Sequence, residues 1–328
     1  MNSSFIASWS DMNTPALLST KQLSVGYGKG LTQKKILGNL NLTLFAGELV
    51  CFMGPNGIGK STLLRTLAGL QVPLEGDVLL NKSVDIGKAI AVVLTDRVQA
   101  YHMTARELIT YGRYPYLNWS LSEKKEDLEK IEQAIDQLHL RPLADQSISS
   151  LSDGQLQMVM IARAVAQDTP ILLLDEPTAH LDLNNRVEIM TVLRQLAHDL
   201  NKSILLATHE LDLALQMADR IWLITKNGTI ATGLPEDLVL NGTFDQVFEL
   251  KGFDLRTGKV AHHPHQNKKI KLNGEGYVYL WTKNALERNG YEVTEDSGEH
   301  IQFIDQKWMY RDAPHDSLCT LLQALDQS

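Results

Sequence analysis

One segment of the sequence combines glycines, a lysine and a serine in a spacing that suits phosphate binding. Residues 54–61 match the pattern GxxxxGK[ST], directly after the apolar run Leu49–Met53 and before a helical pattern. Glycines let backbone N–H groups converge on phosphate oxygens, the lysine bridges the β- and γ-phosphates, and the serine hydroxyl holds Mg²⁺. A chance glycine-rich turn is disfavoured by the flanking strand and helix. The predicted nucleotide contacts are Gly54, Pro55, Asn56, Gly57, Ile58, Gly59, Lys60, Ser61 and Thr62.

Two acidic residues and a histidine follow other apolar runs. Asp175 and Glu176 end the run Ile171–Leu174, and His209 follows the run Ile204–Ala207. Asp175 is predicted to reach Mg²⁺ through water, and Glu176 to orient or deprotonate the attacking water, so Glu176, His209 and Lys60 are the catalytic candidates. An apolar run ending in acids, or a single histidine, is often only structural. The nearby phosphate loop favours the catalytic interpretation, with His209 contacting the γ-phosphate.

These side chains require a sheet whose strands end at one edge. Apolar runs predict strands at Leu23–Tyr27, Ile36–Leu44, Leu49–Met53, Asp77–Leu80, Ala89–Leu94, Ile171–Leu174, Ser203–Ala207, Ile221–Thr225 and Thr229–Ala231. Unbroken apolar runs are typical of parallel strands covered on both faces. Helices are predicted over 122–139, with Leu128, Ile131, Ile135 and Leu138 on the packed face, and over 185–200, with Met190, Leu193, Leu196 and Leu200. The sequence therefore predicts an α/β core with an added antiparallel sheet.

The two ends of the chain have a different pattern. Residues 1–16 are expected to be a flexible tail, 17–254 the main domain, 255–268 a linker and 269–328 a small α+β domain. In the last part we predict strands near 269–272, 291–294 and 301–304, and helices over 282–289 and 316–325. His262, His263 and His265 in the linker could bind a metal. A solvated linker is the favoured interpretation, because no carboxylates or cysteines accompany these histidines as ligands.

Composition restricts the partners and the compartment. The 328 residues carry 31 Lys and Arg against 39 Asp and Glu, a net charge of −8, which argues against a protein that coats nucleic acid. Cys51 and Cys319 are far apart without a CxxC pattern, which fits a reducing compartment and excludes a thiolate zinc cage. We find no membrane-spanning run of about 18 apolar residues and no secretion-signal layout at the start. These features predict a cytoplasmic location.

A further motif identifies the family. Leu151, Ser152, Asp153, Gly154 and Gln155 stand twenty residues before Asp175 and precede a helix. This segment resembles the LSGGQ signature of ABC ATPases, and the resemblance covers about residues 17–250. It implies an ABC nucleotide-binding domain with a RecA-like core, an antiparallel β subdomain and an α-helical subdomain at about 97–168. It also implies roles for three other positions, which are adenine stacking for Tyr27, a D-loop at 179–182 containing Asp182, and the switch histidine for His209.

The resemblance implies a mechanism shared between two copies. In the family, two subunits associate head to tail, so Ser152, Gly154 and Gln155 of one copy would close on the γ-phosphate of ATP held by the other. Two positions depart from the family pattern. Asp153 replaces the first signature glycine and places a negative charge near an anion-binding helix end. Asp96 fills the position of the Q-loop glutamine and could ligate Mg²⁺, with Gln99 three residues later as the alternative.

The segment between these motifs points to a class of transporter. Met103–Leu108 followed by Tyr111–Tyr116 resembles the segment of importers for ferric siderophores, haem and cobalamin where the permease docks. The alternative is an amphipathic surface helix with exposed aromatics. The sequence has one phosphate loop and no predicted span, so the membrane part would be a separate chain.

The sequence as a whole predicts an ATP-hydrolysing, Mg²⁺-dependent importer subunit. We expect a homodimer beneath a multi-span permease, peripheral on the cytoplasmic face of the inner membrane, served indirectly by a periplasmic substrate-binding protein and without nucleic acid. One alternative is a soluble ABC ATPase that remodels a macromolecular complex. Another is a module that binds ATP without hydrolysing it, if Asp96 and Asp153 prevent turnover.

Overall fold

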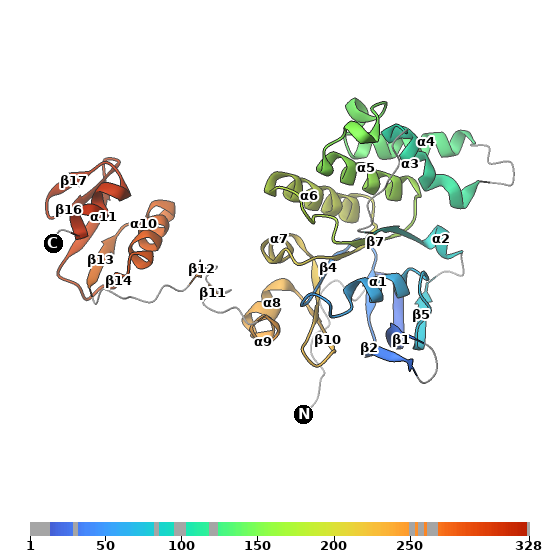
Figure 1. Cartoon of the computed structure of the whole chain (residues 1–328), viewed down its shortest axis with the longest axis horizontal. Helices are drawn as coiled ribbons and strands as arrows, with labels where there is room; N and C mark the ends of the chain where they lie inside the picture. The colour runs from blue at the N-terminus through green and yellow to red at the C-terminus, as the bar shows by residue number, and fades with distance from the viewer. Residues whose placement is uncertain are drawn as a thin grey trace. The chain divides into compact units, whose positions relative to one another are not determined.

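The computed structural model of this chain describes residues 14–28, 32–81, 85–94, 103–117, 124–248, 253–254, 259–260 and 268–326. The chain divides into two compact units, Met1–Glu249 and Leu250–Ser328 (Figure 1). The predicted Mg²⁺ ligand Asp96, its alternative Gln99, and the linker histidines lie outside the described residues. Within the described part, no helix has both the length and the apolar character needed to cross a bilayer.

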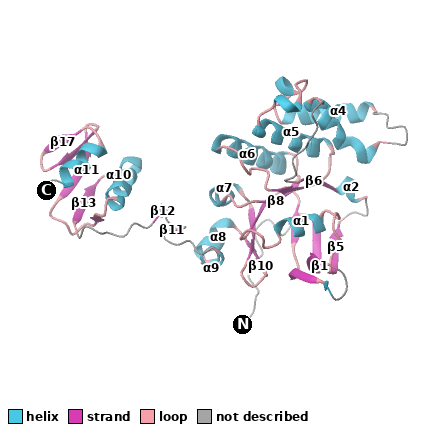
Figure 2. Cartoon of the chain, in the orientation of Figure 1, coloured by secondary structure: helices cyan, strands magenta, loops and turns pink. Residues whose placement is uncertain are grey.

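A six-stranded sheet forms the core of the first unit (Figure 2). In spatial order its strands are β10 (Ile230–Gly233), β9 (Arg220–Ile224), β4 (Leu49–Met53), β8 (Ser203–Ala207), β7 (Ile171–Asp175) and β6 (Ile90–Val93). Every neighbouring pair is parallel except β10 with β9. All residues of β4, β7 and β8 are buried. The parallel arrangement predicted from the unbroken apolar runs is therefore confirmed.

An antiparallel sheet lies beside this core, as predicted. Its strands are β1 (Ala16–Tyr27), β2 (Lys34–Leu40), β3 (Thr43–Phe45) and β5 (Glu75–Leu80), and β1 pairs with the other three. The prediction of one strand over Ile36–Leu44 was wrong. The chain breaks at Asn41–Leu42, where Leu42 N–H donates to the Thr20 hydroxyl (2.8 Å) and Asn41 Oδ1 accepts from Gln22 N–H (3.0 Å).

Helix α1 (Lys60–Leu67) packs between the two sheets. Its buried leucines join one apolar cluster with residues of both sheets: Leu63, Leu64, Leu67, Leu23, Val25, Phe52, Leu173 and Leu205. Each fully buried side chain of this kind contributes about 1.5–3 kcal/mol relative to leaving it in water. The position of α1 is therefore fixed by both sheets.

A layer of helices lies on the side of the core sheet away from the antiparallel sheet, and it contacts the core through the helix over 153–166, which packs on β6 (Figure 1). It contains α3 (Ala105–Thr110), the 3₁₀ helix η2 (Tyr111–Tyr116), α4 (Lys125–Gln137) and α5 (Asp153–Ala166). The remaining helices of the first unit are α2 (Ile86–Ala89), η3 (Arg141–Leu143), η4 (Ile148–Ser150), α6 (Leu183–Asp199), α7 (Leu211–Met217), α8 (Pro235–Leu240) and α9 (Thr243–Val247).

Two residues assigned to packed helix faces are exposed. Leu128 is 49% exposed and Leu200 is 40% exposed, whereas the other six leucine, isoleucine and methionine residues assigned with them are buried. Leu128 lies in the first turn of α4 and Leu200 at the C-terminal cap of α6. A side chain at a helix end has packing partners on one side only, so the periodic pattern overstated their burial.

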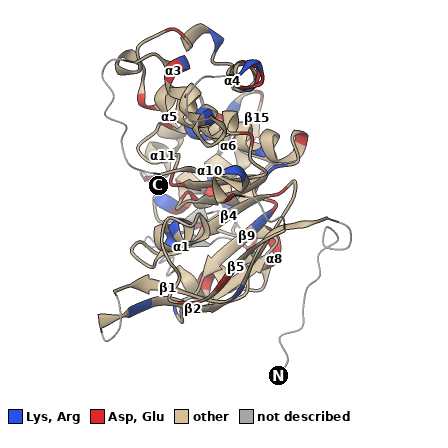
Figure 3. Cartoon of the chain, turned by 90° about the vertical axis from the view of Figure 1, so that its right-hand side faces the viewer, with Lys and Arg blue, Asp and Glu red and all other residues tan. Residues whose placement is uncertain are grey.

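A buried ion pair holds η2 to α4. Arg113 Nε donates to Asp127 Oδ1 at 2.9 Å, and Arg113 Nη1 donates to the carbonyl of Ala166 at 3.0 Å. Burial acts to raise the pKa of Asp127, but hydrogen bonds from the Lys124 N–H and Arg113 outweigh it, so this pKa lies below its usual value. The pair therefore stabilises the fold at neutral pH, and this contribution is lost as the pH falls through the lowered pKa. Around it, Figure 3 shows acidic and basic residues interspersed on α3 and α4.

The Arg113→Met variant is expected to lose about 3–5 kcal/mol of unfolding free energy, because Asp127 stays buried without its cation. The double variant Arg113→Met/Asp127→Leu removes both charges and is expected to recover most of that loss. Arg106→Met, which breaks partly exposed pairs with Asp145 (3.0 Å) and Glu132, is the matched control and should cost about 1 kcal/mol or less. Urea unfolding at neutral pH measures all three. Equal losses for the two single variants would contradict the prediction.

The second unit is built on a five-stranded sheet. Its elements in chain order are β13 (Lys269–Asn273), α10 (Gly276–Arg288), β14 (Glu292–Val293), β15 (His300–Ile304), β16 (Lys307–Tyr310), β17 (Ala313–His315) and α11 (Leu318–Asp326). The spatial order is β14–β13–β15–β16–β17, and β13 is parallel to both of its neighbours. A further pair, β11 (Phe253–Asp254) with β12 (Lys259–Val260), is antiparallel. The sequence predicted α11, the first three strands of the five-stranded sheet and the C-terminal half of α10, whose start at Gly276 precedes the predicted 282, and it missed β16 and β17.

Candidate functional site

The phosphate loop connects β4 to α1 as predicted. Gly59 is the N-cap of α1 with φ of +111°, a conformation that side chains rarely adopt. A Cβ at this position would lie 2.6 Å from Cγ2 of Ile36, so the close approach of β2 also requires glycine. Asn56 and Gly57 at the tip of the loop are exposed. The loop therefore offers accessible backbone N–H groups beside a helix N-terminus, which suits an anion.

Lys60 lies under this loop and is 6% exposed. Its Nζ donates to the carbonyls of Gly54 (2.9 Å) and Pro55 (3.4 Å). Burial lowers the pKa of Lys60, while the carboxylates of Glu176 and Asp175 act to raise it. A cation kept partly dehydrated beside the loop is suited to bind phosphate oxygens.

The carboxyl ends of three neighbouring strands meet at this loop. Phe52 of β4 and Asp175 of β7 both pair with Ala207 of β8. Beyond the strands, Thr208 N–H donates to the Phe52 carbonyl at 3.1 Å, and Glu176 N–H donates to the Ala207 carbonyl at 2.9 Å. The structure thus brings the phosphate loop and the predicted acidic residues to one edge of the sheet, where ligands bind in open α/β sheets.

Asp175 is 2% exposed and has an unused acceptor. Its Oδ1 atom is buried without a hydrogen-bond partner among the described residues. Burial raises the pKa of Asp175, and a hydrogen bond from the Ser61 side chain acts in the opposite direction. Buried polar atoms without a partner are rare and call for an explanation such as an ion or water. A hard cation binds hydroxyl and carboxylate oxygens, so Asp175 and Ser61 fit a Mg²⁺ ion.

Glu176 and His209 contact each other. His209 Nδ1 lies 3.3 Å from Glu176 Oε1, and both side chains are partly exposed. Glu176 has φ of +50°, which is uncommon for a residue other than glycine. Backbone strain of this kind persists where the surroundings enforce it, and it concentrates at functional sites. The Glu176 carboxylate can therefore accept a proton from a bound water molecule, as a general base does.

Tyr27 lies next to the start of α1. Its side chain is 56% exposed, and its hydroxyl is 2.6 Å from the Thr62 hydroxyl. An exposed aromatic ring at this position can stack on a nucleotide base. Tyr27 is thus exposed beside the phosphate loop, and its stacking on adenine stays a prediction.

The segment 151–155 forms the N-terminus of α5. Ser152 is the N-cap, where its hydroxyl accepts from Gln155 N–H (3.3 Å) and its own N–H donates to Gln155 Oε1 (3.0 Å). Ser152, Asp153 and Gln155 are exposed, whereas Gly154 is buried. The Asp153 side chain therefore reaches solvent at the helix start. An anion approaching this helix end would meet its free N–H groups and the positive end of the helix dipole.

The segment 179–182 lies beside this helix start. Asp182 is the N-cap of α6 and accepts from Asn185 N–H and from Asn185 Nδ2, both at 2.9 Å. A Cβ on Gly154 would lie 2.7 Å from Cγ of Asn185, so α5 and α6 meet there without space for a side chain. Asn185 and Arg186 were missed in the sequence. Asn185 packs against Gly154, and Arg186 contacts Leu181 and Glu210. Gly154 and Glu210 are distant in sequence, and the tertiary fold brings them close.

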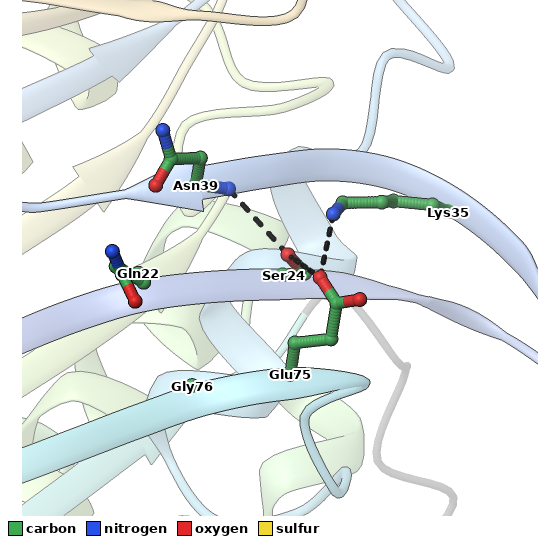
Figure 4. Close-up of a pocket in the computed structure, with 6 residues that line it drawn as sticks. All are labelled: Gln22, Ser24, Lys35, Asn39, Glu75 and Gly76. Atoms are coloured by element: carbon green, nitrogen blue, oxygen red, sulfur yellow. Dashed lines mark hydrogen bonds and ion pairs between the residues drawn. The ribbon is translucent and has the colours of Figure 1, made fainter.

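A hollow of about 380 Å³ lies elsewhere, in the antiparallel sheet (Figure 4). Its lining residues come from β1, β2 and β5: Gln22, Ser24, Lys35, Asn39, Glu75 and Gly76. Glu75 accepts hydrogen bonds from Lys35 Nζ (2.6 Å) and the Ser24 hydroxyl (2.8 Å), which lower its pKa. Its charge is thus already neutralised within the sheet, so the phosphate loop is the better candidate site.

Comparisons with known proteins agree with this geometry. The ABC transporter family matches residues 37–179, and the iron ABC transporter C-terminal domain matches residues 267–326. An ABC transporter ATP-binding protein of Methanocaldococcus jannaschii, MJ0873, is 35% identical over 84% of this chain and 98% of its own length. The protein named "Probable siderophore transport system ATP-binding protein YusV" of Bacillus subtilis is 38% identical over 71% and 86%. The ferric enterobactin transport ATP-binding protein FepC of Escherichia coli is 32% identical over 72% and 88%.

Solved structures show the same fold in the first unit. A transporter assigned to the metal-chelate type, in an inward-facing conformation, aligns with a TM-score of 0.64 and 29% identity over 72% of this chain and 90% of that one. The ATP-binding cassette MJ0796, a dimer in a post-hydrolysis state with ADP and phosphate, aligns with a TM-score of 0.57 and 28% identity over 67% and 99%. The chain therefore belongs to the ABC transporter ATP-binding proteins, the family of ATP-hydrolysing transporter subunits.

Proposed function

We propose that this chain powers an importer for an iron chelate or a related cargo, namely a ferric siderophore, haem or a cobalamin-type molecule. The proposal is supported by the meeting of the phosphate loop, Asp175 and Glu176 at the carboxyl edge of β4, β8 and β7. It is also supported by relatives named for siderophore and enterobactin transport, and by the match of the second unit to an iron ABC transporter domain.

In this proposal each residue at the sheet edge has a defined role. The loop 54–61 and Thr62 hold the phosphates, and Tyr27 stacks on the adenine. Lys60 neutralises the β- and γ-phosphates, Glu176 accepts a proton from the attacking water, and His209 contacts the γ-phosphate. The 3.3 Å contact between His209 and Glu176 supports a shared task for these two side chains.

Mg²⁺ is the metal that this site would hold. Ser61 and Asp175 are its proposed ligands, since a buried carboxylate oxygen without a partner lies beside a hydroxyl there. When bound, the ion neutralises charge on the β- and γ-phosphates. Asp96 remains a proposed third ligand.

We further propose that two copies form two shared sites. Ser152, Gly154 and Gln155 of one copy then face the γ-phosphate held by the loop of the other, with Asp182 of the D-loop nearby. The support is the exposed N-terminus of α5, a 14-residue helix that begins after the capping serine Ser152 and directs the positive end of its dipole there. The dimeric form of MJ0796 is a precedent for such pairing.

The permease would dock on the helical layer. Tyr111 and Tyr114 form an edge-to-face pair with ring centroids 4.9 Å apart, and Tyr114 is 54% exposed. Behind them, the Arg113 guanidinium lies 3.9 Å from the centre of the Tyr116 ring. Exposed, rigidly held aromatic side chains are typical of interface anchors. This proposal places the chain at the cytoplasmic face of the membrane, with a periplasmic binding protein acting through the permease.

The Tyr111→Ala/Tyr114→Ala variant is expected to bind the permease at least about 30-fold more weakly, since the two rings contact each other and together contribute about 2 kcal/mol or more as one anchor. The permease is first captured from native membranes with the full chain and identified by mass spectrometry, and binding to it is then titrated. Leu128→Ala changes a similarly exposed side chain in the same helical layer and is the control. ATP hydrolysis without permease should stay unchanged in both variants.

Uptake of labelled cargo tests the function as a whole. Cells that lack this chain should lose uptake of a ferric siderophore, haem or cobalamin, and the wild-type chain should restore it. Co-purification with ribosomes or DNA in place of a membrane permease would favour the soluble remodelling ATPase.

A further inference from the structure

Arg186 connects two segments of the nucleotide site that are distant in sequence. It lies in the first turn of α6, with a partly exposed side chain. Its Nε atom donates to the carbonyl of Leu181 at 2.6 Å, and its Nη1 atom donates to Oε2 of Glu210 at 2.9 Å. Leu181 belongs to the segment 179–182, and Glu210 directly follows His209.

Glu210 also stabilises the backbone turn that contains His209. Its N–H donates to the Thr208 hydroxyl at 3.0 Å, and its carbonyl accepts from Ala214 N–H at 3.1 Å, so it begins α7. His209 stands between these anchored positions, with Nδ1 at 3.3 Å from Glu176. A shift of Glu210 therefore changes the position of the His209 ring relative to the catalytic carboxylate.

The other end of this connection reaches the start of α5. Asp182, next to Leu181, accepts two hydrogen bonds from Asn185, and Gly154 lies against the side chain of Asn185. Packing this close transmits a displacement because neither side has space to absorb it. A movement of the α5 N-terminus thus passes to the segment 179–182 without an intervening gap.

We propose that Arg186 is a positioning residue that links the two ATP sites of the dimer. The inference rests on the proposed two-copy arrangement. There, the γ-phosphate held by one copy is bound at Ser152 of the other, and the contacts through Asn185, Leu181, Arg186 and Glu210 carry that state to the second copy's own His209. The link is a coupling between sites, so binding of ATP at one site changes hydrolysis at the other.

The arginine is required because one planar group serves two acceptors in different segments. Its guanidinium donates through Nε toward the Leu181 carbonyl and through Nη1 toward the Glu210 carboxylate. A lysine has one compact ammonium group on a flexible chain and lacks this rigid fork. A partly exposed ion pair alone would contribute little to stability, so Arg186 acts through its position and its bond to the Leu181 carbonyl.

The test is steady-state ATP hydrolysis by the full-length chain. For Arg186→Met we expect kcat to fall about fivefold or more, within the range of typical coupling energies, with KM little changed and the Hill coefficient falling toward 1. Arg186→Lys should restore only part of the loss. Asn185→Ala interrupts the connection at its other end and should lower the Hill coefficient in the same way.

Arg194→Met is the matched control. Arg194 lies on the same helix and contacts a carboxylate, Asp219 (3.5 Å), and the carbonyl of Met217, away from His209. Equal kinetics for Arg186→Met and Arg194→Met, or wild-type cooperativity that survives Arg186→Met, would overturn the link alone. A wild-type chain that forms no ATP-dependent dimer would overturn the proposed function as well.

Discussion

The Glu176→Gln chain is expected to bind ATP normally and to hydrolyse it about a hundredfold to ten thousandfold more slowly than the wild type, the range for loss of a general base. The substitution keeps the size of the side chain and removes the group that accepts a proton. Glu176 is held by its N–H bond to Ala207 (2.9 Å), which does not depend on the side chain. The backbone of the site should therefore stay in place.

The same variant should accumulate as an ATP-bound dimer, because ATP that joins two copies is no longer removed. Size-exclusion chromatography with and without Mg-ATP measures this, beside a phosphate-release assay. Glu48→Gln is the control, since Glu48 is a buried carboxylate at the amino end of β4, away from the phosphate loop, where it bonds Phe45 N–H (2.8 Å) and Arg220 (3.2 Å). Persistent monomers of Glu176→Gln would count against the shared site. Equal, near-zero rates for wild type and variant would support the non-hydrolysing module.

The Lys60→Met chain is expected to lose most of its affinity for ATP. Removing one partner of a buried, hydrogen-bonded charge contact costs about 2–5 kcal/mol, or roughly 30-fold to several thousandfold in Kd. Methionine is similar in length to lysine, so it still fills the space under the loop and should keep the loop in place. Titration with a fluorescent ATP analogue measures the change.

Lys202→Met is the control for that loss of affinity. Lys202 is about as buried as Lys60, and burial likewise lowers its pKa, but its Nζ bonds the Thr169 carbonyl (2.7 Å) at the amino end of the sheet. We expect Lys202→Met to reduce stability and to leave the Kd for ATP unchanged. A similar change in Kd for both variants would show that the effect comes from lost folding and not from the phosphate contact.

The core of the first unit could be predicted because its strands are chemically uniform. β4, β7 and β8 are fully buried and apolar apart from Asp175 at the end of β7 and Ser203 at the start of β8, so the run of residue types reveals both the strand and its two covered faces. The break at Asn41–Leu42 could not be predicted in this way. It depends on Thr20, which lies far away in the sequence and accepts the N–H that a continuous strand would use otherwise.

The same distinction applies to the site. Gly54–Ser61, Asp175 and Glu176 could be predicted because local backbone and strand ends place them together. Arg186 could not, since its two partners are Leu181 and Glu210, and nothing in the residue type indicates that α6 brings it between them. β16 and β17 were missed for a related reason. With four and three residues, these segments are too short to show an apolar pattern, so strand pairing defines them.

The capping box at the start of α5 has a consequence for how tightly two copies can hold together. Ser152 and Gln155 already satisfy each other's N–H groups, so in the proposed dimer a phosphate from the second copy would replace existing bonds at these two groups. Exchange of this kind yields a small net free energy. A dimer held by such exchanged bonds would separate easily once the terminal phosphate is released, as repeated cycles of ATP binding and hydrolysis require.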